Sequence, residues 1–197
     1  MIKAFYRLIL ALILEYIRYL EINRNVIARL AGEKEEENDA FRDFLKQADG
    51  VALDKKVHAL NGTISTFIDC TQCGACCKSL MINIVAAELS SVADQLQLSE
   101  EDFKEQYIET SSQGQMIMKS IPCSFLHADK CTVYEQRFAE CREFPHLHKD
   151  NFKGRLFGTL VHYAMCPIIF NVVEELKIET GFKEREEAQA TGAITGF

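Results

Sequence analysis

The chain has no tryptophan, only 3 proline residues among 197, and no hydrophobic run long enough to span a bilayer. Its uninterrupted apolar run near the amino terminus extends from Leu8 to Leu14, far below the roughly 20 residues that a membrane-spanning helix needs. Because no small-residue cleavage site follows this run, a secretory signal peptide is not predicted. Basic residues are also few: 22 Lys and Arg stand against 29 Asp and Glu, for a net charge of -7. We therefore expect no nucleic-acid partner.

The residue present in excess is cysteine, with 8 in the chain. A chain of this length, with 48% apolar residues, builds a hydrophobic core and does not need a scaffold of disulfides. Without a signal peptide, we expect a cytoplasmic location, where thiols stay reduced. In that compartment clustered cysteines are typically metal ligands or catalysts.

The first part of the chain, residues 1–56, is predicted to be helical. Apolar residues recur at helical spacing and predict one amphipathic helix over the first 30 residues, followed by an acidic helical linker from Gly32 to Lys56. We expect the helix to pack on the domain or on a second copy, so that it offers a surface to a protein partner. Peripheral membrane contact, suggested by its basic residues, is the less favoured alternative.

Residues 57–180 are predicted to form a cysteine-cluster metal-binding domain, and residues 181–197 a flexible tail. Short apolar runs at Leu80–Val85 and Gln115–Ile121 predict strands. Helical spacing covers Ala86–Leu96, Ser99 followed by Asp102 predicts a helix start, and a last helix follows Pro167. The fold class is therefore α+β: mainly helical, with short strands and irregular loops organised around a cysteine metal site.

The cysteines form a constellation of candidate metal ligands. Four of them lie in the eight-residue window CTQCGACC, whose Thr, Gln and Gly are poor core formers. Buried, chemically idle cysteines do not explain such a window. The candidate ligands, in chain order, are Cys70, Cys73, Cys76, Cys77, Cys123, Cys131, Cys141 and Cys166.

Spacing within this constellation favours an iron–sulfur cluster over zinc. A C-x2-C turn aims two sulfurs at one point, and a C-x2-C-x2-C run suits three corners of a cluster with a distant fourth ligand. A zinc ribbon would need two separated C-x2-C pairs, and only one region here has that spacing. Eight sulfurs also suffice for two closed four-sulfur sites. The diverging side chains of Cys76 and Cys77 are compatible with ligation of different sites.

A second block, CSFL, CTVYEQR and CREFP, extends from Cys123 to Pro145. Together with CTQCGACC it resembles the YkgJ-like cysteine-cluster family, described as a zinc- or iron-chelating domain. The resemblance covers Cys70 to Cys166, about half of the chain, and includes all eight cysteine positions. It implies metal chelation by these cysteines and no settled reaction. The chain departs from the family where Arg137 is followed by Phe138, since proline is usual there, and we expect Phe138→Pro to be tolerated.

Other polar residues near the cysteines are weaker candidates. Arg137 and Arg142 are expected either to offset thiolate charge or to pair with neighbouring glutamates, and Tyr134 is expected to lie in the core. His127, His146 and His148 are less favoured than the cysteines as ligands. No Ser-His-Asp order, carboxylate pair or Gly-rich nucleotide loop is evident, so catalytic residues stay unknown.

The predicted function is metal binding through the cysteine cluster. An iron–sulfur cluster with a redox role is preferred, and a zinc-stabilised, non-catalytic binding module is the alternative.

Overall fold

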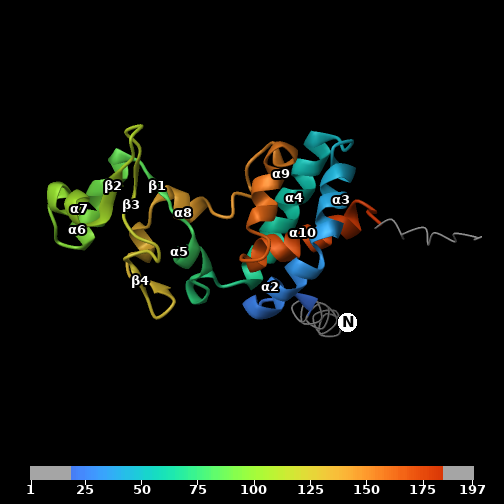
Figure 1. Cartoon of the computed structure of the whole chain (residues 1–197), viewed down its shortest axis with the longest axis horizontal. Coiled ribbons are helices and arrows are strands. Elements are labelled where there is room, and N and C mark those ends of the chain that lie inside the picture. The colour runs from blue at the N-terminus through green and yellow to red at the C-terminus, as the bar shows by residue number, and fades with distance from the viewer. Residues whose placement is uncertain (1–18, 184–197) are drawn as a thin grey trace, which may run out of the picture.

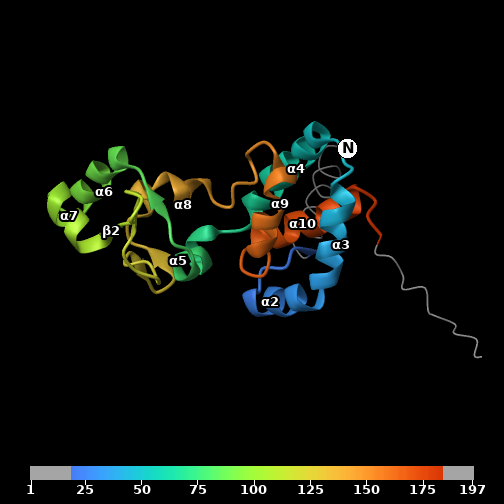
Figure 2. The same cartoon turned by 45° about the horizontal axis from the view of Figure 1, so that its top comes forward.

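The computed structural model describes residues 19–183, which form two lobes (Figure 1). The helical lobe comprises residues 19–68 and 147–183. The cysteine lobe comprises residues 69–143, and residues 144–146 join the two. Each lobe has its own cluster of buried hydrophobic side chains, so the chain crosses between two cores rather than wrapping one. Both views show the lobes side by side, joined by the segments before α5 and after α8 (Figures 1 and 2).

The helical lobe consists of five α-helices and a short 3-10 helix in the described residues. Helices α4 and α10 make the most extensive contact, and α9 packs on α4. Pro167 occupies the first turn of α10, as predicted, where its missing N–H costs nothing. The elements are α2 (Arg24–Glu33), α3 (Glu35–Leu45), α4 (Gly50–Ile64), η1 (Ser65–Phe67), α9 (Phe152–Val161) and α10 (Pro167–Glu179).

The single helix expected over the first 30 residues is interrupted. Residues 21–23 are non-helical, and Asn23 caps α2 by accepting a hydrogen bond from the Asn25 N–H at 3.0 Å. The buried Asn171 side chain of α10 accepts from the Glu21 N–H at 2.9 Å and donates to the Glu21 carbonyl at 2.8 Å. These bonds replace the helical ones at the interruption. The rest of that predicted helix, residues 1–18, lies outside the described residues.

Two predicted boundaries lie within the helical lobe. The expected division between residues 56 and 57 falls inside α4, whose buried face belongs wholly to this lobe. At the other end, Phe182 packs against Phe41 with ring centroids 5.1 Å apart. The remainder of the predicted tail, residues 184–197, is outside the described part of the chain.

The cysteine lobe consists of short elements. Ser99 caps α7 as predicted, accepting from the Asp102 N–H at 3.1 Å. The elements are η2 (Cys70–Gln72), α5 (Ala75–Ser79), β1 (Asn83–Ile84), η3 (Ala86–Glu88), α6 (Leu89–Gln95), α7 (Glu100–Tyr107), β2 (Ile108–Thr110), β3 (Met116–Met118), β4 (Leu126–His127), β5 (Lys130–Cys131), η4 (Tyr134–Gln136) and α8 (Ala139–Glu143).

The strands form two small antiparallel sheets. One has the order β1-β3-β2, with Ile117 opposite both Asn83 and Glu109, and the other is the β4-β5 hairpin. The predicted strands are therefore present but shorter than their apolar runs. This arrangement confirms the mainly helical α+β class. Within residues 19–183, no helix is long and apolar enough to cross a membrane.

Candidate metal centre

The first cysteines lie in a tight turn between the lobes. Asp69 caps η2, and its carboxylate accepts from the Thr71 N–H at 2.9 Å. The Cys73 N–H then donates to the Cys70 carbonyl at 3.2 Å. Gly74 follows with φ +60° and redirects the chain into α5, which carries Cys76 and Cys77. A Cβ at Gly74 would lie 3.0 Å from the Asp129 carbonyl oxygen, so both conformation and space require glycine.

Later segments bring the other cysteines to this turn. The Cys123 N–H donates to the Cys77 carbonyl at 2.8 Å, which joins the two cysteine-rich segments directly. Cys131 ends the β4-β5 hairpin, and Cys141 lies in α8. Cys166 comes from the helical lobe, where it precedes the first residue of α10. All eight cysteines are free thiols.

The eight thiols fall into two sets of four. Members of one set are close enough for the charge on one sulfur to raise the pKa of another: Cys77 acts on Cys123 and Cys131, and all three act on Cys141. In the same way, Cys70 and Cys73 act on Cys166, while Cys76 is affected by Cys141 as well as by Cys166. We group Cys76 with Cys70, Cys73 and Cys166 because these four line one small cavity. We call Cys70, Cys73, Cys76 and Cys166 the junction set, and Cys77, Cys123, Cys131 and Cys141 the lobe set.

The two sets meet at the vicinal pair. The sulfurs of Cys76 and Cys77 are 4.0 Å apart, at hydrogen-bonding distance. Donation from the Cys77 thiol lowers the pKa of Cys76, and the same contact, together with burial, raises the pKa of Cys77.

Backbone amides point at several of the sulfurs. The Phe125 N–H donates to Cys123, the Val133 N–H to Cys131, and both the Ile168 and Ile169 N–H groups to Cys166. Amides two or three residues beyond a cysteine stabilise the thiolate, which is the form that binds metal. These bonds partly oppose the effect of burial, which raises the pKa of Cys166 to about 12.

Arg137, one of the two arginines considered in the sequence analysis, places a positive charge close to cysteines of both sets. Burial raises the pKa of Cys70, Cys131 and Cys141, and the Arg137 guanidinium acts against it at all three. The guanidinium stacks on the Tyr134 ring, 3.7 Å from its centroid, and donates to the Tyr134 carbonyl at 2.6 Å. Half-buried Tyr134 thus holds Arg137 between the two sets.

Arg142 has a different role. It pairs with Glu88 at 3.1 Å rather than with Glu135, Glu140 or Glu143, the partners considered from the sequence. The Glu88 carboxylate also accepts from the Ala139 N–H at 2.7 Å. Glu88 therefore fixes the start of α8 and positions Cys141, a role that sequence spacing alone does not reveal.

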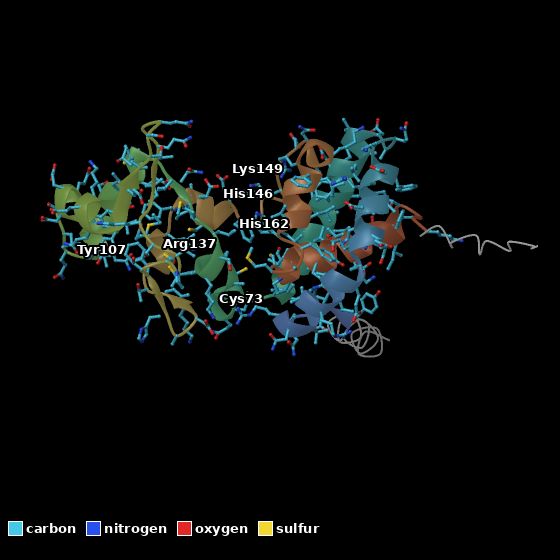
Figure 3. All side chains as sticks on the ribbon, in the orientation of Figure 1. Cys73, Tyr107, Arg137, His146, Lys149 and His162 are labelled. Atoms are coloured by element: carbon cyan, nitrogen blue, oxygen red, sulfur yellow. The ribbon has the colours of Figure 1, made fainter. Side chains whose placement is uncertain are left out.

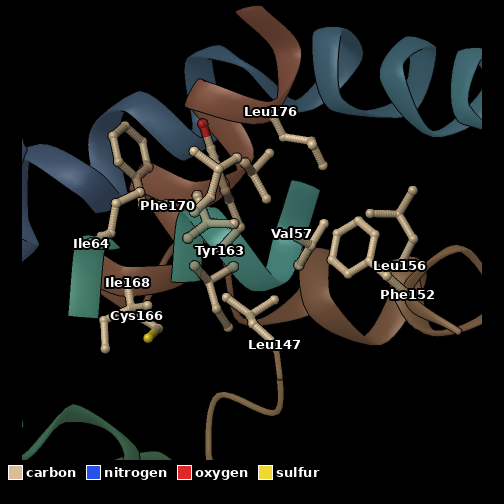
Figure 4. Close-up of a cluster of buried hydrophobic side chains, with 14 of the residues drawn as sticks. Val57, Ile64, Leu147, Phe152, Leu156, Tyr163, Cys166, Ile168, Phe170 and Leu176 are labelled. Atoms are coloured by element: carbon tan, nitrogen blue, oxygen red, sulfur yellow. The ribbon is translucent and has the colours of Figure 1, made fainter. Parts of the chain in front are cut away.

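A small apolar cavity lies beside the junction set. It measures about 40 Å³ and is lined by all four junction-set cysteines together with Ile68, Phe144 and Pro145. Cys166 lies at the edge of the helical-lobe core, near Ile168 and Leu147 (Figure 4). Figure 3 shows Cys73 on the side of the cysteine lobe that faces the helical lobe. The junction set thus draws ligands from both lobes.

The donors fit a soft metal, although they are not yet in coordinating positions. In residues 19–183, no group of three or more His, Cys, Asp or Glu side chains is arranged so that it could hold a metal ion. Four thiols with amide donors and a nearby guanidinium are chemically suited to zinc or iron, and the less favoured His127, His146 and His148 are not needed to complete either set.

These features define a metal-chelating cysteine domain. Residues 69–158 match the model of the family described as "CxxCxxCC: Putative zinc- or iron-chelating domain". This match confirms that the cysteine motifs resemble a zinc- or iron-chelating domain. The match covers the cysteine lobe and much of α9, and Cys166 lies beyond it. Comparisons with curated proteins and with solved structures gave no match.

Proposed function

We propose that the protein binds two iron–sulfur clusters, one through each set of four cysteines, and that it works in a reducing compartment such as the cytoplasm. The observation that carries the proposal is geometric: Cys70, Cys73, Cys76 and Cys166 line one small cavity, whereas Cys77 is joined to Cys123 by a backbone hydrogen bond and lines a second cavity with Cys123 and Cys141. Four thiolates are the usual complement for one cluster. An iron–sulfur cluster, when bound, exchanges single electrons.

The surrounding residues support this role. Amide donors at Cys123, Cys131 and Cys166 hold the thiolates in orientation, and Arg137 offsets part of their charge. Hydrogen bonds to sulfur and nearby charge are among the factors that set a cluster's reduction potential. Apolar side chains line the small cavity beside the junction set.

A zinc-stabilised binding module is the second candidate. It is favoured by the separation into two closed four-thiol sets, because structural zinc takes four ligands in a tetrahedral site. In that case metal binding would contribute mainly to folding stability.

Purification without oxygen, followed by metal and sulfide analysis and an absorption spectrum, distinguishes the two candidates. We expect a brown protein with broad visible absorption, iron and acid-labile sulfide. A colourless protein with stoichiometric zinc and no sulfide would overturn the iron–sulfur proposal in favour of the second candidate.

Paired substitutions test the two sets. Cys73→Ser and Cys166→Ser should each remove about half of the bound metal, and combining them should remove no more, because both belong to the junction set. Combining Cys73→Ser with Cys141→Ser should remove nearly all of it. If every single variant lost all of the metal, or if the two double variants behaved alike, the assignment to two sets would be wrong.

A further inference from the structure

A larger cavity of about 300 Å³ lies where the lobes meet, beside both sulfur sets. One wall carries the thiols of Cys76, Cys77, Cys123 and Cys141. Most of the remaining lining is apolar and includes Met81, Met118 and Phe144. The volume is at the lower end of the range of about 300–1,000 Å³ that is usual for small-molecule sites.

Two histidines form the polar side of this cavity. The Phe144 ring lies between them, with ring centroids 6.0 Å from His146 and 5.6 Å from His162, both edge to face. His162 comes from the end of α9, so the helical lobe closes a cavity whose other walls belong mostly to the cysteine lobe. Figure 3 shows both histidines at the junction of the lobes.

The His146 backbone is held on two sides. Its N–H donates to the Glu143 carbonyl at 2.7 Å, and its carbonyl accepts from the Arg155 guanidinium at 3.0 Å. The buried Nδ1 atom has no hydrogen-bond partner among residues 19–183, and Nε2 lies 3.9 Å from the Glu140 carboxylate.

The charge around the cavity is negative. Glu140 lines it, and none of the described side chains that line it is Lys or Arg. Two neighbouring cations are engaged elsewhere: Lys149 with Glu143 at 2.5 Å, and Arg142 with Glu88 at 3.1 Å. Thiolates of metal-bound cysteines would add negative charge, since four thiolates exceed the charge of a divalent ion.

We propose that this cavity binds a small molecule with an apolar body and a protonated amine as its polar head. The apolar body contacts Met81, Met118 and Phe144, and the ammonium group lies near the Glu140 carboxylate. The contribution of the thiolates to this selectivity rests on the metal-binding function proposed above, whereas the shape of the cavity and the charge of Glu140 do not.

Hexylamine is a suitable probe, with hexanol and hexanoate as comparators of equal chain length. Titration of the metal-loaded protein by calorimetry or by NMR should show saturable binding of hexylamine, at least tenfold tighter than that of hexanoate. Binding of hexanoate as tight as that of the amine, or no saturable binding of hexylamine, would overturn the proposal.

Three variants locate the binding site. Met81→Trp should fill the cavity and weaken hexylamine binding at least tenfold. Val85→Trp, at a position that is 61% exposed and outside the cavity, should leave binding unchanged. Glu140→Gln should weaken hexylamine binding and leave hexanol binding unchanged. Equal binding to Met81→Trp and wild type, or an unchanged preference for amine in Glu140→Gln, would overturn the proposal.

Metal content separates this proposal from the preceding one. All three variants should retain the metal and the visible spectrum of the wild type, because none replaces a cysteine. If the wild type held no metal but still bound hexylamine in the way described, the metal-binding function would be wrong and the cavity assignment would stand.

Discussion

Lys177 is buried in the helical lobe, with 6% of its side chain exposed, between Glu37 at 2.8 Å and Glu174 at 2.7 Å. Lys177→Met should lower the free energy of unfolding by about 2 kcal/mol, because Glu37 and Glu174 lose their buried cation and keep only Lys34, whose side chain is 29% exposed. Urea unfolding followed by circular dichroism measures the change. Arg29→Met is the matched control: its pair with Glu33 is more than half exposed, so its loss should cost below about 1 kcal/mol. Equal losses would contradict this interpretation.

The same network makes stability depend on pH. Burial raises the pKa of Glu174, but hydrogen bonds from Lys177, Lys34 and Tyr163 outweigh burial and hold the pKa below its ordinary value of 4.5. A carboxyl with a lowered folded-state pKa stabilises the fold above 4.5, and this stabilisation is lost as the pH falls through the folded-state pKa. Unfolding free energies measured from pH 6 to about pH 3 should therefore fall less steeply for Lys177→Met than for the wild type. Parallel curves would exclude this contribution from Glu174.

At position 138, the backbone conformation alone does not decide whether the proline that is usual in the family would be tolerated. Its φ of −56° is one that proline adopts, but its side chain is 2% exposed and packs against Phe103, with ring centroids 6.4 Å apart. The expectation that Phe138→Pro is tolerated is therefore replaced. The substitution should lower the free energy of unfolding by about 3 kcal/mol, through the cavity it leaves.

Phe138→Leu provides the control for that experiment, because it keeps an apolar side chain of intermediate volume. It should cost only about 1 kcal/mol in chemical denaturation. A Phe138→Pro variant as stable as the wild type would show that the neighbouring side chains close the cavity.

At the scale of elements, the turn that carries the first cysteines depends on Gly74. Gly74→Ala should lower the free energy of unfolding by more than about 1 kcal/mol and weaken metal binding, since the new Cβ adds a contact at 3.0 Å with Asp129 to the cost of φ +60°. Denaturation and metal analysis test both effects.

Gly114→Ala separates conformation from crowding. Gly114 has φ +78°, but a Cβ there meets open space, so only the conformational cost of about 1 kcal/mol should remain, and the metal content should not change. If the two variants lost the same stability and metal, the contact with Asp129 would be unimportant.

Local signals predicted those elements whose causes are local. The Ser99 cap and Pro167 indicated where α7 and α10 begin, and alternating residues indicated β3. The interruption before α2 was not predictable, because the hydrogen bonds that replace helical ones come from Asn171, which is distant in sequence. Apolar spacing alone continued the helix through residues 21–23.

The candidate site was predictable in composition but not in arrangement. The spacing identified all eight cysteines as candidate ligands. The diverging side chains of the adjacent Cys76 and Cys77 were compatible with ligation of two different metal sites. The grouping of the later cysteines with the earlier ones depends on the β4-β5 hairpin, on α8 and on the packing of α10. The cysteine spacing does not predict any of these features. The larger cavity was not predictable either, because one of its two histidines, His162, comes from the helical lobe.

At the scale of the whole molecule, the two sulfur sets differ in where they lie relative to the lobes. The lobe set lies entirely within the cysteine lobe, whereas the junction set takes Cys76 from α5 and Cys166 from the start of α10. The two hydrophobic cores are otherwise separate, and the chain crosses between them only before α5 and after α8 in the described residues. Metal bound by the junction set would therefore hold the lobes together.

Cys166→Ala and Cys131→Ala form a matched pair for this idea, since each removes one thiol from one set. Loss of metal from the junction set should free the lobes and increase the radius of gyration measured by small-angle X-ray scattering, while the circular dichroism of the helical lobe persists. Loss of metal from the lobe set should loosen the cysteine lobe internally, which limited proteolysis would detect between residues 110 and 130, and should change the scattering less. An unchanged radius of gyration in Cys166→Ala that has lost its junction metal would mean that the lobes are held together by their direct packing, and that the junction metal serves chemistry rather than architecture.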